Sequence, residues 1–431
     1  MRLPDSVNVL LLGGGGREHT FACKIAQSRR LSKLYIAPGN GGTAELGSNV
    51  DLSAANLAVL KCFIVSQHIN LVVVGPEEPL VRGVVDQLRD DPDTHLVPVI
   101  GPTAKGAALE GSKDFAKAFM MRHNIPTAAY RSFTDVAQGE AFLETLAPPY
   151  VLKADGLAAG KGVSIVGTLP EAKSELAAML GGRFGEAGSR VVIEQYLNGI
   201  ECSVFVATDG ANYKILPVAK DYKRAGEGDT GPNTGGMGAV SPVAFADETF
   251  MERVCTRIIK PTIEGLRSEK IDYKGFIFIG LMNVDGDPYV IEYNVRMGDP
   301  ETEVVLPRVK SDVVELFEAI AYGGLDRYEL EISPDTAATV VCVSEGYPGE
   351  YAKGSPVTGL ADVEKSLVFH AGTTLKGGSP VTSGGRVLAV TSLDATLEGA
   401  LAKCYESIGR IEYQGKTFRA DIGRDLLKYN R

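Results

Sequence analysis

The segment Tyr289–Glu301, with the sequence YVIEYNVRMGDPE, decides how this chain is interpreted. Four of its first five residues are β-branched or aromatic, and they follow a turn at Asp285–Pro288, so the segment predicts a strand after a tight turn. Because alternate side chains of a strand share one face, Glu292, Asn294 and Arg296 should point the same way, and Ile291, Tyr293 and Val295 should share the other face. A carboxylate beside an amide oxygen suits Mg²⁺ held jointly with nucleotide phosphates, and the arginine adds a fixed cationic fork for a carboxylate or phosphate.

A turn at Gly298–Pro300 should bring Asp299 and Glu301 to the same edge as this strand. Taken alone, the Glu-x-Asn pattern is more often that of a half-exposed strand whose polar face meets water. The metal interpretation therefore depends on whether the chain supplies a nucleotide site elsewhere.

The composition is that of an ordinary globular protein, with 44% apolar and 23% charged residues in 431, which favours about three domains. The net charge of −10 argues against general nucleic-acid binding. No apolar run approaches the ~18 residues that a membrane-spanning helix needs. Six scattered cysteines without a C-x-x-C pair, and no signal-peptide pattern, favour reduced thiols in a cytoplasmic protein.

The first hundred residues predict a doubly wound parallel α/β domain, because short apolar runs alternate with helical patterns. The predicted strands are Val7–Leu12, Leu34–Ala37, Leu71–Val74 and Val97–Ile100. Four glycines, Gly13–Gly16, follow the first strand and precede a helix, a layout that presents backbone N–H groups to an anion. The dinucleotide fingerprint fits poorly because Glu18 occupies its third glycine position. A sugar phosphate is the better ligand, and a tight turn without a ligand is the alternative.

Loops 13–17, 38–43 and 75–80 should lie together, because each leaves the carboxyl end of a parallel strand. Glu77 and Glu78 in the third loop could bind the hydroxyls or the amine of a small polar ligand. Alternatively, these carboxylates only favour the dipole of a solvated helix start.

A second group of features predicts a phosphate-binding flap. A helix over 103–124 carries Lys113 near its middle, and strands Tyr150–Ala154 and Val163–Val166 flank a glycine-rich hairpin. Such a hairpin covers phosphates with backbone N–H groups while Lys153 reaches in from its strand. The P-loop pattern does not fit, because a strand rather than a helix follows.

The remaining chain continues this mixed pattern. A strand over 190–197 runs into a bend that could give an adenine edge one acceptor and one donor, and Glu201 could reach ribose hydroxyls. Residues 221–239 form a glycine-rich loop whose Asp221, Lys223 and Arg224 could pin it over a substrate. We also expect a helix over 246–268, a strand Gly275–Val284 paired with the opening strand, a helix over 311–321, and a β-rich region from about 334.

With the flap, the bend and the Glu-x-Asn strand in this order, the chain resembles the ATP-grasp superfamily and, within it, the phosphoribosylamine–glycine ligase family. The resemblance covers the whole chain. It rests on Gly14–His19, Ala37–Asn40, Gly75–Glu77, Leu109–Lys113, Lys153–Val163, Gly231–Ala239 and Gly298–Thr302.

This resemblance implies three domains: an N-terminal α/β domain over 1–107, an ATP-grasp domain over 108–333 with a mobile lid near 126–197, and a C-terminal β-rich domain over 334–431. It implies that ATP, glycine and 5-phosphoribosylamine give glycinamide ribonucleotide, ADP and phosphate. We expect a monomer that binds neither nucleic acid nor membrane.

The resemblance also implies roles for residues at matching positions. Glu292 and Asn294 would bind Mg²⁺ or Mn²⁺, and Arg296, Asp299 and Lys153 would be catalytic. Contacts to ATP would come from Lys113, Lys153, Gly156, Gly160, Lys161, Gly162, Glu194, Gln195, Tyr196, Leu197 and Glu201. By analogy with related purine-pathway enzymes, substrate contacts would come from Gly15, Gly16, Arg17, Asn40, Gly41, Gly42, Glu77, Asp299 and Arg386, together with Asp221 and Lys223.

The chain departs from the family pattern in a few places. Tyr222 stands where we expect histidine, and Val295 and Met297 flank Arg296 where Cys and Phe are usual. The strand 275–284 supplies no acid, which leaves the number of protein metal ligands open. Alternatives are an ATP-grasp ligase or carboxylase acting on another acid, a nicotinamide-dependent oxidoreductase, and an inactive nucleotide-binding regulator.

Overall fold

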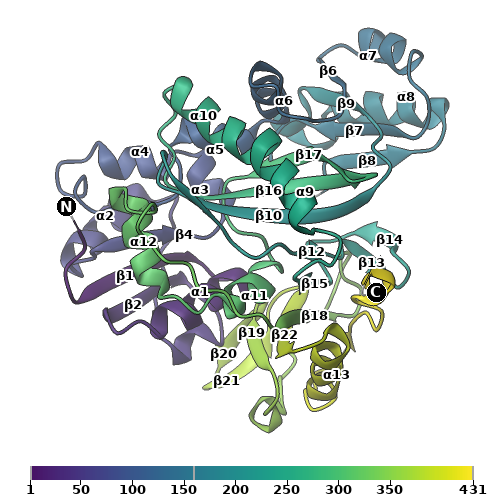
Figure 1. Cartoon of the computed structure of the whole chain (residues 1–431). Coiled ribbons are helices and arrows are strands. Elements are labelled where there is room, and N and C mark those ends of the chain that lie inside the picture. The colour runs from purple at the N-terminus through teal and green to yellow at the C-terminus, as the bar shows by residue number, and fades with distance from the viewer. Residues whose placement is uncertain (1, 159–160, 430–431) are drawn as a thin grey trace.

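The computed structural model describes residues 2–158 and 161–429. Figure 1 shows a parallel sheet built from the start of the chain, a central group of sheets, and a sheet at the C-terminal end. No helix among the described residues is long and apolar enough to cross a membrane.

The N-terminal sheet confirms the predicted doubly wound parallel arrangement. Its strand order is β3 (Ser48–Asn49), β2 (Leu31–Pro38), β1 (Val7–Gly13), β4 (Leu71–Val74), β5 (Val99–Ile100), and every neighbouring pair is parallel. Four helices accompany it: α1 (Gly16–Ala26), α2 (Leu57–Ser66), α3 (Glu77–Val81) and α4 (Val84–Arg89). The carboxyl ends of β1, β2 and β4 meet at one edge, so the three predicted loops are neighbours.

The central sheet is antiparallel, in the order β11 (Tyr213–Ile215), β10 (Ile200–Thr208), β16 (Gly275–Val284), β17 (Asp287–Asn294). A tight turn with positive φ at Asp285 (51°) and Gly286 (91°) joins the last two strands, as two-residue hairpins require. In Figure 1, α9 (Glu248–Val254) and α10 (Lys260–Ser268) lie across one face of this sheet. The predicted helix over 246–268 and strand over 275–284 are confirmed.

A β-bulge corrects the predicted alternation along β17. Gly280 pairs with Glu292, but the next residue of β16, Leu281, pairs with Val290, so Ile291 is the extra residue. Val290 and Tyr293 are therefore both in the core, whereas Ile291 is only half-buried. Our prediction that Ile291 shares a face with Tyr293 is wrong, because the bulge shifts the side-chain period by one residue.

Residues 130–195 form a separate antiparallel sheet in the order β6 (Tyr130–Phe133), β9 (Val191–Gln195), β7 (Tyr150–Ala154), β8 (Val163–Val166). Helices α7 (Val136–Leu143) and α8 (Leu169–Ala178) pack on it and share a small core with it. The predicted hairpin around 155–162 is confirmed in its flanking strands. A region with its own core can move as a body, and its motion stays a prediction.

The helix predicted over 103–124 is broken, and this changes the place of Lys113. Helix α5 (Ala104–Gly111) is followed by Ser112, which is extended (φ −142°, ψ 117°), and α6 then spans Lys113–Arg122. The hydroxyl of Ser112 accepts a hydrogen bond from the N–H of Phe115 at 3.1 Å, as an N-cap does. Lys113 therefore begins a helix instead of lying in the middle of one.

The C-terminal sheet has the order β12 (Lys220–Asp221), β15 (Gly238–Ser241), β18 (Thr336–Ser344), β22 (Arg386–Asp394), β19 (Leu367–His370), with β23 (Lys416–Thr417) paired to β18. Helix α13 (Leu397–Ile408) packs on it, and β20 (Thr373–Lys376) and β21 (Ser379–Thr382) form a hairpin. The segment 221–239, which we predicted as a loop, thus has both ends in this sheet. Between them lies the hairpin β13 (Arg224–Gly226) and β14 (Thr230–Asn233).

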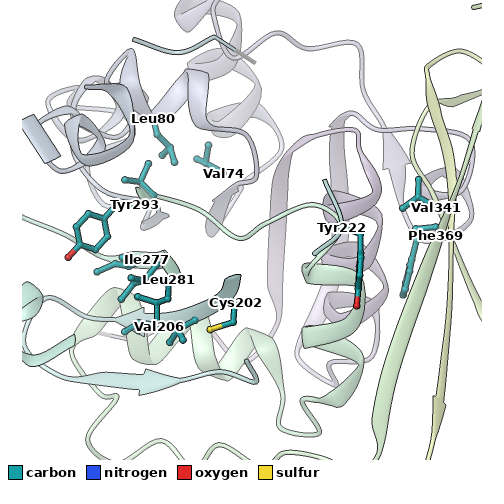
Figure 2. Packing of buried hydrophobic residues seen from close by; sticks show 14 of the residues in the cluster. Val74, Leu80, Cys202, Val206, Tyr222, Ile277, Leu281, Tyr293, Val341 and Phe369 are labelled. Atoms are coloured by element: carbon teal, nitrogen blue, oxygen red, sulfur yellow. The ribbon is translucent and has the colours of Figure 1, made fainter. Parts of the chain in front are cut away.

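One hydrophobic core connects the three parts of the chain. It includes Val74 and Leu80 of the first part, Ile277 and Tyr293 of the central sheet, and Phe369 of the C-terminal sheet (Figure 2). α11 (Thr302–Val305) and α12 (Val313–Tyr322) belong to a second core that also contains β1 and β10 residues. Shared packing of this kind holds the loops of one part against the strand ends of another.

Candidate active site

The end of β17 meets the glutamates of the N-terminal part through Arg296. Its Nε lies 3.2 Å from Glu77 Oε2, and its Nη2 lies 2.8 Å from Glu110 Oε1. The same Nη2 donates to Asn294 Oδ1 at 3.2 Å. Burial raises the pKa of Glu77, but the charges of Arg296 and Arg17 outweigh it, so the pKa is lowered. Arg296 thus joins the predicted substrate edge to the predicted metal edge.

Arg17 and Glu18 form a buried pair behind the glycine-rich loop. Arg17 Nε lies 2.6 Å from Glu18 Oε1, and Arg17 Nη1 donates to the carbonyl of Met297 at 3.2 Å. Glu18 Oε2 also accepts the N–H of Gly15 at 2.6 Å. In this structure the Arg17 side chain therefore fixes the loop against the β17 end, and its predicted substrate contact stays a prediction.

Asp299 stands opposite the first turn of α1 and beside the C-terminal part. Its Oδ1 is 2.9 Å from Arg386 Nη1, and its Oδ2 accepts the N–H of Arg17 at 3.4 Å. Arg386 also donates to the carbonyl of Gly235 at 2.8 Å. These three predicted residues, Arg17, Asp299 and Arg386, come from three distant stretches and meet at one place.

Two buried acids lie under this place, and sequence reasoning gave neither a role. Burial, with the nearby charge of Asp221, raises the pKa of Glu301 to about 8. Glu303 is fully buried, and neither of its carboxylate oxygens has a hydrogen-bond partner among the described residues. A Cβ atom at Gly16 would collide with Glu303 Oε1, so a larger residue there would have to displace that carboxylate. Burial and the charge of Asp299 raise the pKa of Glu303, which favours its neutral form.

Asn40 clamps the second loop with its whole side chain. Its Nδ2 donates to the carbonyls of Gly14 (3.1 Å) and His370 (2.7 Å), and its Oδ1 accepts the N–H of Gly42 at 2.9 Å. Gly41 donates its N–H to the carbonyl of Thr373 at 3.2 Å. The loop is thereby tied to both the glycine-rich loop and the C-terminal part. Substrate contacts from these three predicted residues remain predictions.

The residues predicted to bind metal fit a cation held partly by other ligands. The carboxylate of Glu292 makes no hydrogen bond with any described residue, and its charge acts on Lys113 and Lys223. Asn294 is buried, its Nδ2 has no partner among the described residues, and its Oδ1 accepts only one bond, from Arg296. No group of three or more His, Cys, Asp or Glu residues in the described part could hold a metal alone. Two hard-oxygen ligands suit Mg²⁺ or Mn²⁺ when phosphate and water complete the shell.

Two lysines, Lys153 and Lys113, lie near this pair, and Lys113 also contacts the start of the flap. Lys153 on β7 lies 3.0 Å from Glu194 Oε1 and donates to the carbonyl of Ile291 at 3.3 Å, one residue before Glu292. Lys113 donates to the carbonyl of Gly156 at 3.2 Å. Lys161 is exposed on the flap, and the carbonyl of Gly162 accepts the N–H of Ala154 at 2.8 Å. Gly160, also predicted to contact ATP, lies outside the described residues.

The predicted adenosine-binding residues lie at the end of β9 and on β10. Gln195 and Tyr196 are exposed and Leu197 is half-buried where β9 ends, whereas the Glu194 side chain is buried. Glu201 on β10 lies 2.9 Å from Lys223 Nζ. The charge of Lys223 lowers the pKa of Glu201, and burial, with the nearby charge of Glu201, raises that of Asp221. Asp221, Lys223 and Glu201 therefore form one charged cluster near Glu292.

A cavity of about 740 Å³ opens between the flap and the C-terminal part. Lys161 and Ser164 line it on the flap side, Arg224 and Asn233 on the 221–239 segment, and Tyr347 on the C-terminal side. Of the residues predicted to contact ATP, only Lys161 is among its described lining residues.

Several residues of the site were missed. Glu110 lies in a quoted motif, but its contact with Arg296 spans 186 residues and leaves no local signal. Lys117 follows Lys113 by one helical turn, which could have suggested a second lysine on the same side of α6. Glu303 follows Asp299 by four residues, and nothing in the sequence marks it as buried.

The contact between His19 and the C-terminal part predicts acid sensitivity. His19 Nδ1 accepts the N–H of His370 at 2.7 Å. Burial, with the charge of His370, lowers the pKa of His19 to about 3, and burial lowers that of His370 to about 4. Below pH 6.5 the unfolded chain therefore binds more protons than the folded protein. The contribution of the two neutral histidines to stability is fully present above pH 6.5 and is lost as the pH falls toward 3.

For each of the two histidines, the free energy of unfolding of the wild-type protein should fall by about 1.4 kcal/mol per pH unit below 6.5. Urea unfolding at pH 7.5 and 5.0 measures this loss. His19→Gln keeps an acceptor for the His370 N–H, and it should shrink the difference between the two pH values. An equal difference in both proteins would contradict the assignment.

Comparison with known proteins gives one answer over the whole chain. Residues 7–110, 111–302 and 337–425 match the N domain, the ATP-grasp (A) domain and the C domain of phosphoribosylglycinamide synthetase. The phosphoribosylamine–glycine ligase of Chlorobaculum tepidum is 46% identical over 98% of this chain and 100% of its own length. That of Pseudomonas aeruginosa is 46% identical over 99% of both chains.

Solved structures agree with this result. The crystal structure of the phosphoribosylamine–glycine ligase of Thermotoga maritima has a TM-score of 0.84 and 35% identity, covering 96% of this chain and 100% of that one. Biotin carboxylase of Campylobacter jejuni, at 14% identity and a TM-score of 0.74 over 98% of this chain and 96% of that one, shares the fold alone. The three-part architecture is thus that of ATP-grasp enzymes, and the chain belongs to the phosphoribosylamine–glycine ligase family.

Proposed function

We propose that this chain joins glycine to 5-phosphoribosylamine with ATP and releases glycinamide ribonucleotide, ADP and phosphate. The observation that carries the proposal is the placement of Arg296, which contacts Glu77 at the substrate edge and Asn294 at the metal edge. A site for a phosphorylated amine and a site for ATP therefore share one arginine. Family membership supports the same reaction.

The site residues then have the following roles. Glu292 and Asn294 would hold Mg²⁺ or Mn²⁺, and the bound ion would supply positive charge to the ATP phosphates. Lys113, Lys153 and the flap bind the phosphates, and the bend after Glu194 with Glu201 binds adenosine. The glycine-rich loop at Gly15–Arg17 and the loop at Asn40–Gly42 bind the sugar phosphate, with Glu77, Asp221, Lys223, Asp299 and Arg386 around it.

The chemistry needs positioned charge rather than a protein nucleophile. A glycine carboxylate oxygen, docked at the Arg296 and Asp299 edge, attacks the γ-phosphorus of ATP, and ADP leaves. The product is glycyl phosphate, in which phosphate is a leaving group. The phosphoribosylamine nitrogen attacks the carbonyl carbon, loses a proton, and phosphate departs with one former carboxylate oxygen. The flap at 155–162 closes over the site to exclude water, because water would hydrolyse the acyl phosphate.

The reaction is tested by ADP formation with glycine and freshly made phosphoribosylamine. We expect ADP only when both are present with a divalent cation. Alanine or bicarbonate in place of glycine should give no more ADP than buffer alone. Equal ADP with alanine or bicarbonate would favour another ATP-grasp ligase or carboxylase.

The intermediate has a separate test by isotope labelling. Glycine carrying heavy oxygen in both carboxylate positions should yield inorganic phosphate with one heavy oxygen per turnover. The other heavy oxygen should stay in the amide of the product. Mass spectrometry of phosphate and AMP measures this directly. Label in AMP, or unlabelled phosphate at full turnover, would exclude glycyl phosphate even if the overall reaction occurs.

We further propose that the protein is a cytoplasmic monomer. The charged residues of the site come from all three parts of a single chain. This supports a site that one copy completes alone. Sedimentation of the purified protein with and without Mg-ATP tests this, and a dimer at working concentration would contradict it.

A further inference from the structure

Lys117 lies at the meeting point of the lid and the rest of the chain, and the reaction gives it no role. Its ammonium is 3.0 Å from Glu194 Oε2 and donates to Thr127 Oγ1 at 2.7 Å and to the carbonyl of Ala128 at 3.4 Å. The residue is 2% exposed. An ammonium group has three donors, and protein acceptors use all three. Lys117 therefore cannot reach a ligand itself.

Glu194 is shared between two lysines. Its carboxylate lies 3.0 Å from Lys117 on α6 and 3.0 Å from Lys153 on β7, and its side chain is 4% exposed. Burial raises its pKa, but the charges of Lys153 and Lys117 outweigh this and keep it ionised. A buried carboxylate of this kind must keep at least one cationic partner.

The other contact of Lys153 places it beside the metal edge. It donates to the carbonyl of Ile291, the bulged residue before Glu292, and it lies one residue before the end of β7, where the flap follows. Lys153 makes two hydrogen bonds, to Glu194 and to Ile291, so its third donor can bind a phosphate oxygen, and movement of the ammonium toward that oxygen weakens its pairing with Glu194. If Lys117 were neutral, this movement would leave Glu194 buried without a counter-charge.

Thr127, near the start of the predicted lid, links Lys117 to the strand that carries Glu292. Thr127, which accepts from Lys117, donates its own hydroxyl to the carbonyl of Val290 at 2.6 Å. Thr127 also forms an isolated bridge with Val290. Lys117 is thereby linked to the residues just before β6, to β9 through Glu194, and through Thr127 to β17, the strand that carries Glu292.

We propose that Lys117 is a positioning residue that holds the charge of Glu194 so that Lys153 is free to bind the ATP phosphates. This inference rests on the proposed phosphate contact of Lys153. It assigns a role to a lysine that touches neither ATP nor metal.

The test compares steady-state constants and Mg-ATP protection for Lys117→Met, Glu194→Gln and their combination. Lys117→Met should raise the KM for ATP by roughly 10- to 100-fold, since Lys153 is then retained by Glu194. The KM for glycine should change by less than about threefold, because the change acts through Lys153. The rise in melting temperature on adding Mg-ATP should shrink in the same variant.

The combined variant is the decisive one. When Glu194 is neutral, Lys117 has no charge to hold, so Lys117→Met/Glu194→Gln should have a KM for ATP within about threefold of Glu194→Gln. A tenfold difference between these two proteins would overturn the proposal, and this comparison stands even if Lys117→Met alone fails to fold. A wild-type KM for ATP in folded Lys117→Met would overturn it as well.

Two further variants separate the possible failures. Arg122→Met, at the end of the same helix, removes an ion pair with Glu269 (2.8 Å) and should leave the KM for ATP unchanged. Lys153→Met should lose phosphate binding outright. If Lys153→Met behaves as wild type, the phosphate site itself is wrongly placed. If Lys153→Met is impaired but Lys117→Met is not, only the positioning role fails.

Discussion

Glu292→Ala and Asn294→Ala are each expected to lower kcat by about 10³-fold or more, because divalent metal supplies several kcal/mol of charge stabilisation in phosphoryl transfer. The fold should survive both changes. Glu292 makes no hydrogen bond with a described residue, and Asn294 accepts only one, from Arg296. Neither side chain therefore supports the packing of β17, which depends on Val290 and Tyr293.

The measurement pairs initial rates at saturating substrates with urea unfolding. Asp287→Ala is the matched control, since Asp287 begins the same strand and pairs with Arg253 (3.1 Å) and Arg257 (2.8 Å). These exposed ion pairs contribute about 1 kcal/mol at most to the free energy of unfolding. Asp287 is not among the site residues, so kcat should be retained. If Glu292→Ala unfolds at much lower urea and is fully active before unfolding, Glu292 is structural.

Local patterns were sufficient for the elements around the site. Apolar runs followed by glycines identified β1 and β4, and the turn at Asp285–Gly286 identified the hairpin of β16 and β17. These predictions succeed because burial on both faces and a two-residue turn are properties of neighbouring residues. The grouping of loops 13–17, 38–43 and 75–80 followed from the rule for parallel sheets.

What escaped prediction depends on distant partners. Residue Ser112 breaks the helix because its cap and its bond to Asp155, 43 residues away, outweigh helical continuity. The bulge at Ile291 depends on the register between β16 and β17. The alternation of side chains along one strand does not reveal that register. Glu110 and Glu303 gain their importance only from burial beside charges brought from elsewhere.

Motif residues of the site also make contacts within the protein that their motifs do not reveal. Asn40 belongs to a motif that marks the family, yet all the described hydrogen bonds of its side chain are with backbone atoms. Arg17 is likewise committed to Glu18 and Met297. A motif residue can therefore shape the site without touching substrate, and the sequence alone cannot separate these two roles.

Arg296→Met is expected to impair both stability and catalysis. Glu110 has a side chain that is 7% exposed, and Arg296 is its ion-pair partner at 2.8 Å. Removing one partner of a buried pair costs about 3–5 kcal/mol of unfolding free energy. Asn294 loses its hydrogen bond and Glu77 its cation, so kcat/KM should fall by at least about 10²-fold.

The pH dependence identifies Glu110 as the cause of the lost stability. Burial already raises the pKa of Glu110 above its ordinary 4.5, and Arg296 opposes that rise. Without Arg296 the folded-state pKa climbs further, so the stability loss is largest above that pKa and vanishes as pH falls toward 4.5. Urea unfolding of Arg296→Met at pH 8 and pH 5 should show the smaller loss at pH 5.

Arg296→Met/Glu110→Gln then separates the two effects. A neutral glutamine needs no counter-charge, and its Oε1 can still accept the N–H of Val295, as Glu110 does at 2.7 Å. Stability should return to within about 1 kcal/mol of wild type and lose its added pH dependence. Catalysis should not return, because Glu77 and Asn294 still lack Arg296. Recovery of activity together with stability would mean that Arg296 serves the fold alone, and the link between the substrate edge and the metal edge would then have no part in the reaction.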